Sequence, residues 1–366
     1  MIVLVWSSTI SLHGITIEIR RMCDHGGTCE AGDFFFDHPE ALDALRFATR
    51  AFEPFSDTLL AIPSTPGWTA TFENPDNGIE TIQLQNLSVP ANTLILYAGG
   101  YDMPGNQVGE AGPGKTPAFT LNRGSGVVTG PTANDFTPWG GSIAFDTLDN
   151  GAPRNWHFDV DTLPAPGEID FLTIAFHELS HAFGFGTAPS FDNLNSSGQF
   201  QGAATIQLAQ STVSLAADGN HWASGTTSPP YADPPLSALT ASLVLGRRRV
   251  LTPLDYAALA DLGWQVPDKL LGLLGDIDDD GNIDGRDFLR WQRSVGNTGV
   301  GLLEDADGSL EVDDYDLWLW QTNYGRKTTS NSSFAAVPEP CTIPLLFLSG
   351  ISILRCRPLR QISRYR

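Results

Sequence analysis

The stretch from Asp170 to Gly184 constrains the fold most, because it combines a helical apolar pattern with two histidines four residues apart. Apolar residues recur at the spacing of one helix face, Asp170 suits the N-terminal cap, and Gly184 suits the helix end. His177 and His181 then lie on one face, since residues i and i+4 are neighbours on a helix. The pattern predicts a buried helix that presents two imidazoles in one direction.

The residue types on this helix predict a metal site. Two imidazoles are suitable zinc ligands, but catalytic zinc sites use three protein ligands and keep one position open. Glu178 directly follows the first histidine, where a carboxylate can take a proton from water held by the metal. His177, Glu178 and His181 therefore predict a zinc peptidase site whose third ligand lies elsewhere in the chain.

Length and charge limit the other possibilities. The chain has 366 residues, 41% of them apolar, which is enough for a sizeable core and more than one domain. Its net charge of −21 disfavours nucleic acid as a partner. The acidic residues are densest between 276 and 316, with 13 acidic and three basic side chains, which indicates bound cations.

Residues 276–325 contain an acidic repeat with a 29-residue period. In both copies oxygen-bearing side chains fall on positions 1, 3, 5, 7, 9 and 12 of a calcium loop, whose sixth position favours glycine. Gly281 meets this demand in the first copy. Leu310 stands there in the second, so we expect a strained turn and weaker calcium binding. The predicted calcium ligands are Asp276, Asp278, Asp280, Asn282, Asp284, Asp287, Asp305, Asp307, Ser309, Glu311, Asp313 and Asp316.

The rest of the chain predicts an α+β fold: a mixed twisted sheet with an active-site helix, then a small all-α calcium-loop module and a C-terminal hydrophobic helix. Residues 99–141 are rich in glycine and proline and are expected to form long loops. The expected strands are 16–19, 93–97 and 142–145, and further helices are expected at 38–52 and 252–263.

The domain organisation follows from these patterns. We expect a zinc peptidase domain, a linker, the calcium-loop module, a second linker rich in Ser, Thr and Asn, and a tail. Their ranges are 1–266, 267–275, 276–325, 326–336 and 337–366.

The two ends and the cysteines bear on location. Residues 341–354 are uncharged and precede five arginines, which predicts a short membrane-directed segment with a basic flank. Residues 1–12 are apolar but lack the basic start and cleavage site of an export signal, so we expect the natural start to lie upstream. Cys23 and Cys29 are close enough for a local disulfide or a metal clip, and we expect a local disulfide, or no pairing, rather than a functional site.

The segment 170–186 resembles the active-site helix of the metzincin metallopeptidases, and residues 139–264 are similar to matrixin-like and leishmanolysin-like members. The resemblance implies a zinc endopeptidase acting on a peptide or protein substrate. It also implies that Ser142–Asp146 is the edge strand that holds an extended peptide by main-chain pairing.

The chain departs from this family at two positions. Thr187 stands where the compact pattern has its third histidine, so the resemblance to leishmanolysin-like members implies His221 as third ligand. The alternatives are His157, Asp192, or a surface histidine at 221 without a role. Leu239 stands where the family has a methionine beneath the metal, a swap of similar volume. Tyr231 is a candidate second donor to the oxyanion. The predicted zinc ligands are His177, His181 and His221, with Glu178 as catalytic base.

The C-terminal parts resemble two further families. Residues 276–325 look like a dockerin, which implies a cohesin-like partner. The tail from Val337 looks like a PEP-CTERM sorting signal, which implies processing by an exosortase and an exported or cell-surface protein. The alternative function is a non-catalytic surface or scaffold protein with a degenerate metallopeptidase domain, an alternative that Thr187 and Leu239 keep open.

Overall fold

A computed structural model describes residues 14–25, 29–64, 67–115 and 122–328. The described residues all belong to one compact unit, and the predicted C-terminal helix and sorting tail lie outside them. No helix of the described ranges is long and apolar enough to cross a membrane. The described part is a mixed α+β structure, as the sequence predicts.

The helices include all those predicted within the described residues. The helical segment after Asp170 begins and ends where expected, since Asp170 accepts a hydrogen bond from the Thr173 amide and Gly184 has a φ of 101°. The helices are α1 (Phe34–Asp37), α2 (Pro39–Thr49), α3 (Phe171–Ala182), α4 (Pro189–Leu194), α5 (Ala203–Ala209), α6 (Pro253–Asp261), α7 (Gly285–Ser294) and α8 (Asp314–Asn323), with 3₁₀ turns η1 (Met22–His25) and η2 (Asp268–Leu271).

The strands form one central sheet and several small ribbons. The central sheet has the order β1-β4-β6-β5, with β1, β4 and β6 parallel and β5 antiparallel to β6. The main strands are β1 (Thr16–Arg21), β2 (Thr69–Glu73), β3 (Thr81–Gln85), β4 (Thr93–Tyr101), β5 (Gly109–Pro113) and β6 (Gly140–Asp146); the short ones are β7 (Leu148–Asp149), β8 (Ala152–Pro153), β9 (Trp156–His157), β10 (Ile169–Asp170), β11 (Asn195–Ser196), β12 (Gln199–Phe200) and β13 (Val213–Ser214).

The edge of the central sheet differs from the sequence prediction. The segment Ser142–Asp146 belongs to β6, which pairs with β4 on one side and β5 on the other, so it is an inner strand. The edge on this side of the sheet is β5, which lies within the stretch 99–141 that was expected to be loops. Its sequence, Gly-Glu-Ala-Gly-Pro, has no apolar alternation, and its strand structure depends on pairing with β6.

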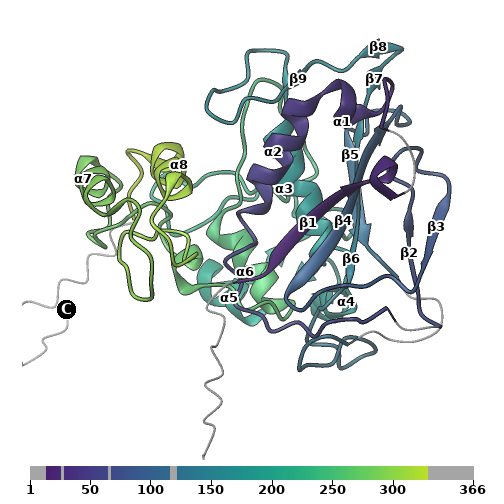
Figure 1. The fold of residues 1–366 in the computed structure, drawn as a ribbon. Helices are drawn as coiled ribbons and strands as arrows, with labels where there is room; N and C mark the ends of the chain where they lie inside the picture. Colours follow the sequence, from purple (N-terminus) through teal and green to yellow (C-terminus); the bar gives the residue numbers. More distant parts are fainter. Residues whose placement is uncertain (1–13, 26–28, 65–66, 116–121, 329–366) are drawn as a thin grey trace, which may run out of the picture. The chain divides into compact units, whose positions relative to one another are not determined.

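The central sheet separates two apolar layers. Leu94, Leu96 and Ala98 on β4 pack into the larger core with α2 and α3, whereas Ile95 and Tyr97 pack into a smaller core with β2 and β3. This alternation follows from the strand period of two. In Figure 1, α2 and α3 lie against one face of the sheet, and β2 and β3 lie on the other side.

The acidic repeat forms two similar loop–helix units, ending in α7 and α8. The Trp291 indole donates to the carbonyl of Asp313 (2.6 Å), and the Trp320 indole donates to the carbonyl of Asp284 (2.7 Å). Since the two tryptophans occupy equivalent repeat positions, these reciprocal bonds relate the units by an approximate two-fold symmetry.

Candidate metal centre

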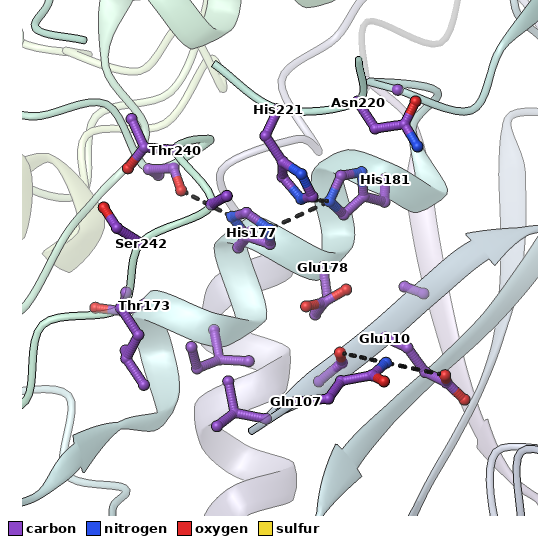
Figure 2. Close-up of a pocket in the computed structure, with 18 of the residues that line it drawn as sticks. Gln107, Glu110, Thr173, His177, Glu178, His181, Asn220, His221, Thr240 and Ser242 are labelled. Carbon is purple, nitrogen blue, oxygen red and sulfur yellow. Dashed lines mark hydrogen bonds between the residues drawn. The ribbon is translucent and has the colours of Figure 1, made fainter. Parts of the chain in front are cut away.

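Three histidine side chains converge in a cleft beside α3 (Figure 2). The Nε2 atom of His181 lies 3.2 Å from Nε2 of His177 and 3.1 Å from Nε2 of His221. The first two residues are one turn apart on α3, whereas His221 comes from a loop 40 residues beyond His181. The structure thus brings together the three residues that the sequence analysis names as zinc ligands.

The second ring nitrogen of each histidine has its own hydrogen-bond partner. Each Nδ1 atom lies 2.8–2.9 Å from a carbonyl or carboxylate oxygen. Such oxygens accept hydrogen bonds, so Nδ1 carries the proton and Nε2 presents a lone pair. The pairs are His177 with the Ala238 carbonyl, His181 with the Phe185 carbonyl, and His221 with the Asp218 carboxylate.

This arrangement fits a zinc ion. Three lone pairs at this spacing repel one another unless a cation lies among them. Zn–N bonds of about 2.0–2.1 Å in a tetrahedral site place ligand nitrogens roughly 3.3 Å apart, close to the separations seen here. Burial, reinforced by the neighbouring imidazoles, lowers the pKa of His177 to about 3 and of His181 to about 4. Both rings are therefore neutral, as metal ligands must be.

Glu178 lies beside the histidines, under the edge strand β5. Its side chain is buried, and a Cβ atom on Gly109 of β5 would come within 3.0 Å of its Oε1 atom, so glycine is needed at this crossing. Burial, with repulsion from Glu110, raises the pKa of Glu178 to about 8, against a backbone hydrogen bond from Ala111. In the metal-free protein this carboxylate therefore has a high affinity for a proton.

A buried carboxylate positions the loop that carries His221. Asp255, at the start of α6, accepts hydrogen bonds from the Trp222 indole (3.1 Å) and from the Ser237 hydroxyl. Trp222 follows His221 directly, and Ser237 precedes Ala238, whose carbonyl orients His177. Asp255 thereby connects two segments of the metal centre that are distant in sequence.

The cleft has a volume of about 440 Å³ and lies between α3, β5 and the segment 238–243. Gly109, Glu110 and Ala111 of β5 line one part of it. Glu110 accepts a hydrogen bond from the Tyr101 hydroxyl (2.7 Å) and from Gln107 (3.2 Å). The edge strand and the three histidines therefore face the same cavity.

The structure excludes the other candidate residues from this site. His157 contacts the Thr162 carbonyl and the Glu168 carboxylate, and Asp192 is exposed on α4; neither belongs to the histidine cluster. The suggestion of Tyr231 as an oxyanion donor is wrong, because its buried hydroxyl accepts from the Leu274 amide (3.3 Å) and does not line the cleft.

The two departures from the family pattern have structural roles. Thr187 lines the cleft and donates its hydroxyl to the carbonyl of His181 (2.7 Å), so it supports a ligand-bearing turn. Leu239 is fully buried directly after Ala238 and accepts a hydrogen bond from the Trp222 amide (3.0 Å). Leu239 therefore packs in the main core and pairs with the residue that follows His221.

Each acidic loop gathers the carboxylates of positions 1, 3 and 12, whose oxygens lie within 4.8 Å of one another. Oxygen donors at this density suit Ca²⁺. Leu310 has a φ of 74°, so the expected strain at position 6 of the second loop is present. The gathered residues are Asp276, Asp278 and Asp287 in the first loop, and Asp305, Asp307 and Asp316 in the second.

The other predicted ligand positions make local contacts. Asp284 and Asp313 cap α7 and α8, and Asp280 pairs with Arg286 (2.9 Å). These contacts hold the loops in shape but leave the side chains of positions 5, 7 and 9 outside the clusters of three carboxylates. The remaining positions are Asn282, which bonds to Asp280, and Ser309 and Glu311, which bond to each other.

Sequence reasoning missed several residues that build the metal centre. Asp218 carried a local signal, because an acid three residues before a ligand histidine can reach its ring. Asp255 lay inside the helix expected at 252–263 and carried no signal for a contact with Trp222. Glu110 and the edge strand lay in the stretch expected to form loops.

Comparisons with family models, curated proteins and solved structures found no match to this chain.

Proposed function

We propose that this chain is an exported zinc-dependent endopeptidase of the metzincin type, with His177, His181 and His221 as ligands and Glu178 as general base. The observation that carries the proposal is the convergence of three Nε2 atoms beside a buried carboxylate in one cleft, with each Nδ1 atom turned to an oxygen partner. An edge strand antiparallel to its neighbour, packed over the active-site helix, supports the metzincin type.

The reaction would be hydrolysis of a peptide bond by an attacking water. Zinc, when bound, supplies Lewis-acid polarisation and makes water acidic near neutral pH. Glu178 takes the proton of the attacking water and delivers it to the leaving amine. Its burial, which strengthens its hold on a proton, suits this role. The Ala238, Phe185 and Asp218 oxygens keep the imidazoles in the ligand tautomer.

The substrate would bind along β5. This strand ends the central sheet, and its first residues line the cleft. Strand β2 pairs with this part of the chain only beyond β5, through Thr71 and Lys115. An extended peptide can add to such an edge by main-chain hydrogen bonds. Gly109 keeps the strand close to Glu178 and would bring a bound peptide near the base.

Two variants test the proposal. Glu178→Gln should keep zinc stoichiometric and abolish phenanthroline-sensitive cleavage of casein or a peptide library. His221→Ala should lose zinc, whereas His157→Ala, the control, should keep both zinc and activity. Hydrolysis by Glu178→Gln near the wild-type rate would refute the base. Zinc without any hydrolysis in the wild type would favour the non-catalytic scaffold protein.

The acidic repeat would act as a calcium-dependent docking module for a cohesin-like domain. The support lies in the surface of α7, where Leu289 and Val295 are about half exposed. On α8, by contrast, Tyr315, Trp318 and Leu319 are buried in the main core. A partner would therefore bind on the α7 side.

Export and tail processing rest mainly on the sequence. The tail lies outside the described residues, but the predicted Cys23–Cys29 disulfide is formed, which suits an oxidising compartment.

A further inference from the structure

One arginine of the cleft differs from the other buried arginines of the described chain. Arg123 donates to four backbone carbonyls, Arg154 pairs with Asp146, and Arg248 pairs with Asp170. Arg249 is only 9% exposed, yet its guanidinium has one partner among the described residues, the hydroxyl of Thr240 (2.6 Å). No carboxylate of those residues lies within ion-pair distance of it.

Arg249 belongs to the same cavity as the metal centre. Its guanidinium bonds to Thr240, two residues after Ala238, whose carbonyl orients His177. Its backbone amide bonds to the Thr173 hydroxyl on α3 (2.8 Å), which fixes the start of the side chain. All these residues line the cleft, and Figure 2 shows Thr240 and Thr173 on one side of the histidines with Glu110 on the other.

A guanidinium carries five N–H donors, and a nearly buried one with a single neutral acceptor is poorly compensated. A carboxylate can supply two parallel charge-assisted hydrogen bonds to it. An amide of the same shape supplies only one acceptor oxygen and no charge, so the cleft should distinguish Glu from Gln.

We propose that Arg249 determines specificity, selecting substrates that carry one carboxylate side chain close to the scissile bond. The inference rests on the proposed function, since it names the substrate class of that site. Glu110 in the same cleft and the net charge of −21 oppose a second acidic residue. The preferred peptide is therefore singly acidic near the cleaved bond.

The test uses binding, so that it does not depend on turnover. The zinc-reconstituted Glu178→Gln protein is titrated calorimetrically with two series of peptides that have no other charged side chain. One series carries a single Glu at each successive position, and the other carries Gln at the same position. At one position we expect Glu to bind at least about 10-fold more tightly, equivalent to about 1.4 kcal/mol. Adding Arg249→Met should remove the preference, Arg249→Lys should keep part of it, and Arg46→Met, which removes an exposed charge outside this cleft, should keep it whole.

Equal binding of Glu and Gln peptides at every position overturns the inference, even if the wild type cleaves peptides in a phenanthroline-sensitive way. An Arg249-dependent preference without any wild-type cleavage supports Arg249 as the carboxylate-binding residue of the cleft and refutes the peptidase. If Arg249→Met does not fold, the comparison of Glu and Gln peptides on the protein that retains Arg249 still tests whether the cleft prefers a carboxylate. Arg249→Lys then serves as the second variant.

Discussion

The two acidic loops have the same ligand spacing but different surroundings. In the first loop Asp276 and Asp278 are half-buried, and the following helix α7 buries only Asp287. In the second loop all three gathered carboxylates are buried, and α8 packs into the main core. The first copy thus lies at the surface, whereas the second copy is part of the main hydrophobic core, here called the body of the protein.

The contacts of α8 reach the active-site helix. The Trp318 ring lies 5.2 Å from the Phe47 ring on α2 and 6.0 Å from the Phe176 ring on α3, measured between centroids. Phe176 directly precedes the ligand His177. Arg50 at the end of α2 also pairs with Asp313 and Asp314. The difference teaches that one copy of a repeated motif can stay at the surface while the other joins the core.

The largest expected effect is the difference between the two loops in how much calcium binding stabilises the fold. Calcium added to zinc-loaded protein at about a thousandfold excess over its Kd should stabilise the body by roughly 4 kcal/mol through the second loop. Asp316→Asn should remove most of this gain in thermal unfolding, whereas Asp287→Asn should affect mainly hydrogen exchange of α7. Equal losses of global stability in both variants would contradict the comparison.

The next largest effect is the different response of the two acidic loops to acidification, measured on zinc-loaded, calcium-free protein. Burial raises the pKa of Asp316 to about 7 and that of Asp276 to about 6. A carboxyl whose pKa is higher in the folded than in the unfolded state binds protons preferentially in the folded state. The free energy of unfolding should therefore rise as the pH falls from about 8 towards 4. The second loop should contribute first, because the pKa of Asp316 is the higher of the two. The melting temperature measures this, and Asp316→Asn should flatten the upper part of the curve while Asp276→Asn should not.

The smallest effect concerns the ion pairs between α2 and the second loop. Arg50 is partly exposed, so Arg50→Met should cost only about 1 kcal/mol or less. Arg46→Met, which removes the exposed pair with Asp43 on the same helix, is the matched control and should be nearly neutral. Denaturant unfolding at low and high salt measures both. A loss above about 2 kcal/mol would show that these pairs are more strongly coupled to the core than their exposure indicates.

Much of the fold was predictable because its signals are local. The cap at Asp170, the left-handed turn at Gly184 and the capping box of Thr252 and Asp255 depend on neighbouring residues. The edge strand was not predictable, because Gly109–Pro113 forms a strand only through pairing with β6. The burial of the second loop was also hidden, because nothing local distinguishes a Trp318 ring exposed to solvent from one packed on Phe176.

The sequence by itself determined one helix with two imidazoles and a carboxylate on it, and two loops with oxygens at calcium spacing, since helix and turn geometry fix such sets within a few residues. Only the tertiary structure decided that His221 meets His181, that β5 lines the cleft and that Arg249 has no carboxylate partner among the described residues. These depend on packing between segments tens of residues apart, where the hydrophobic core and buried groups such as Asp255 select one arrangement from many.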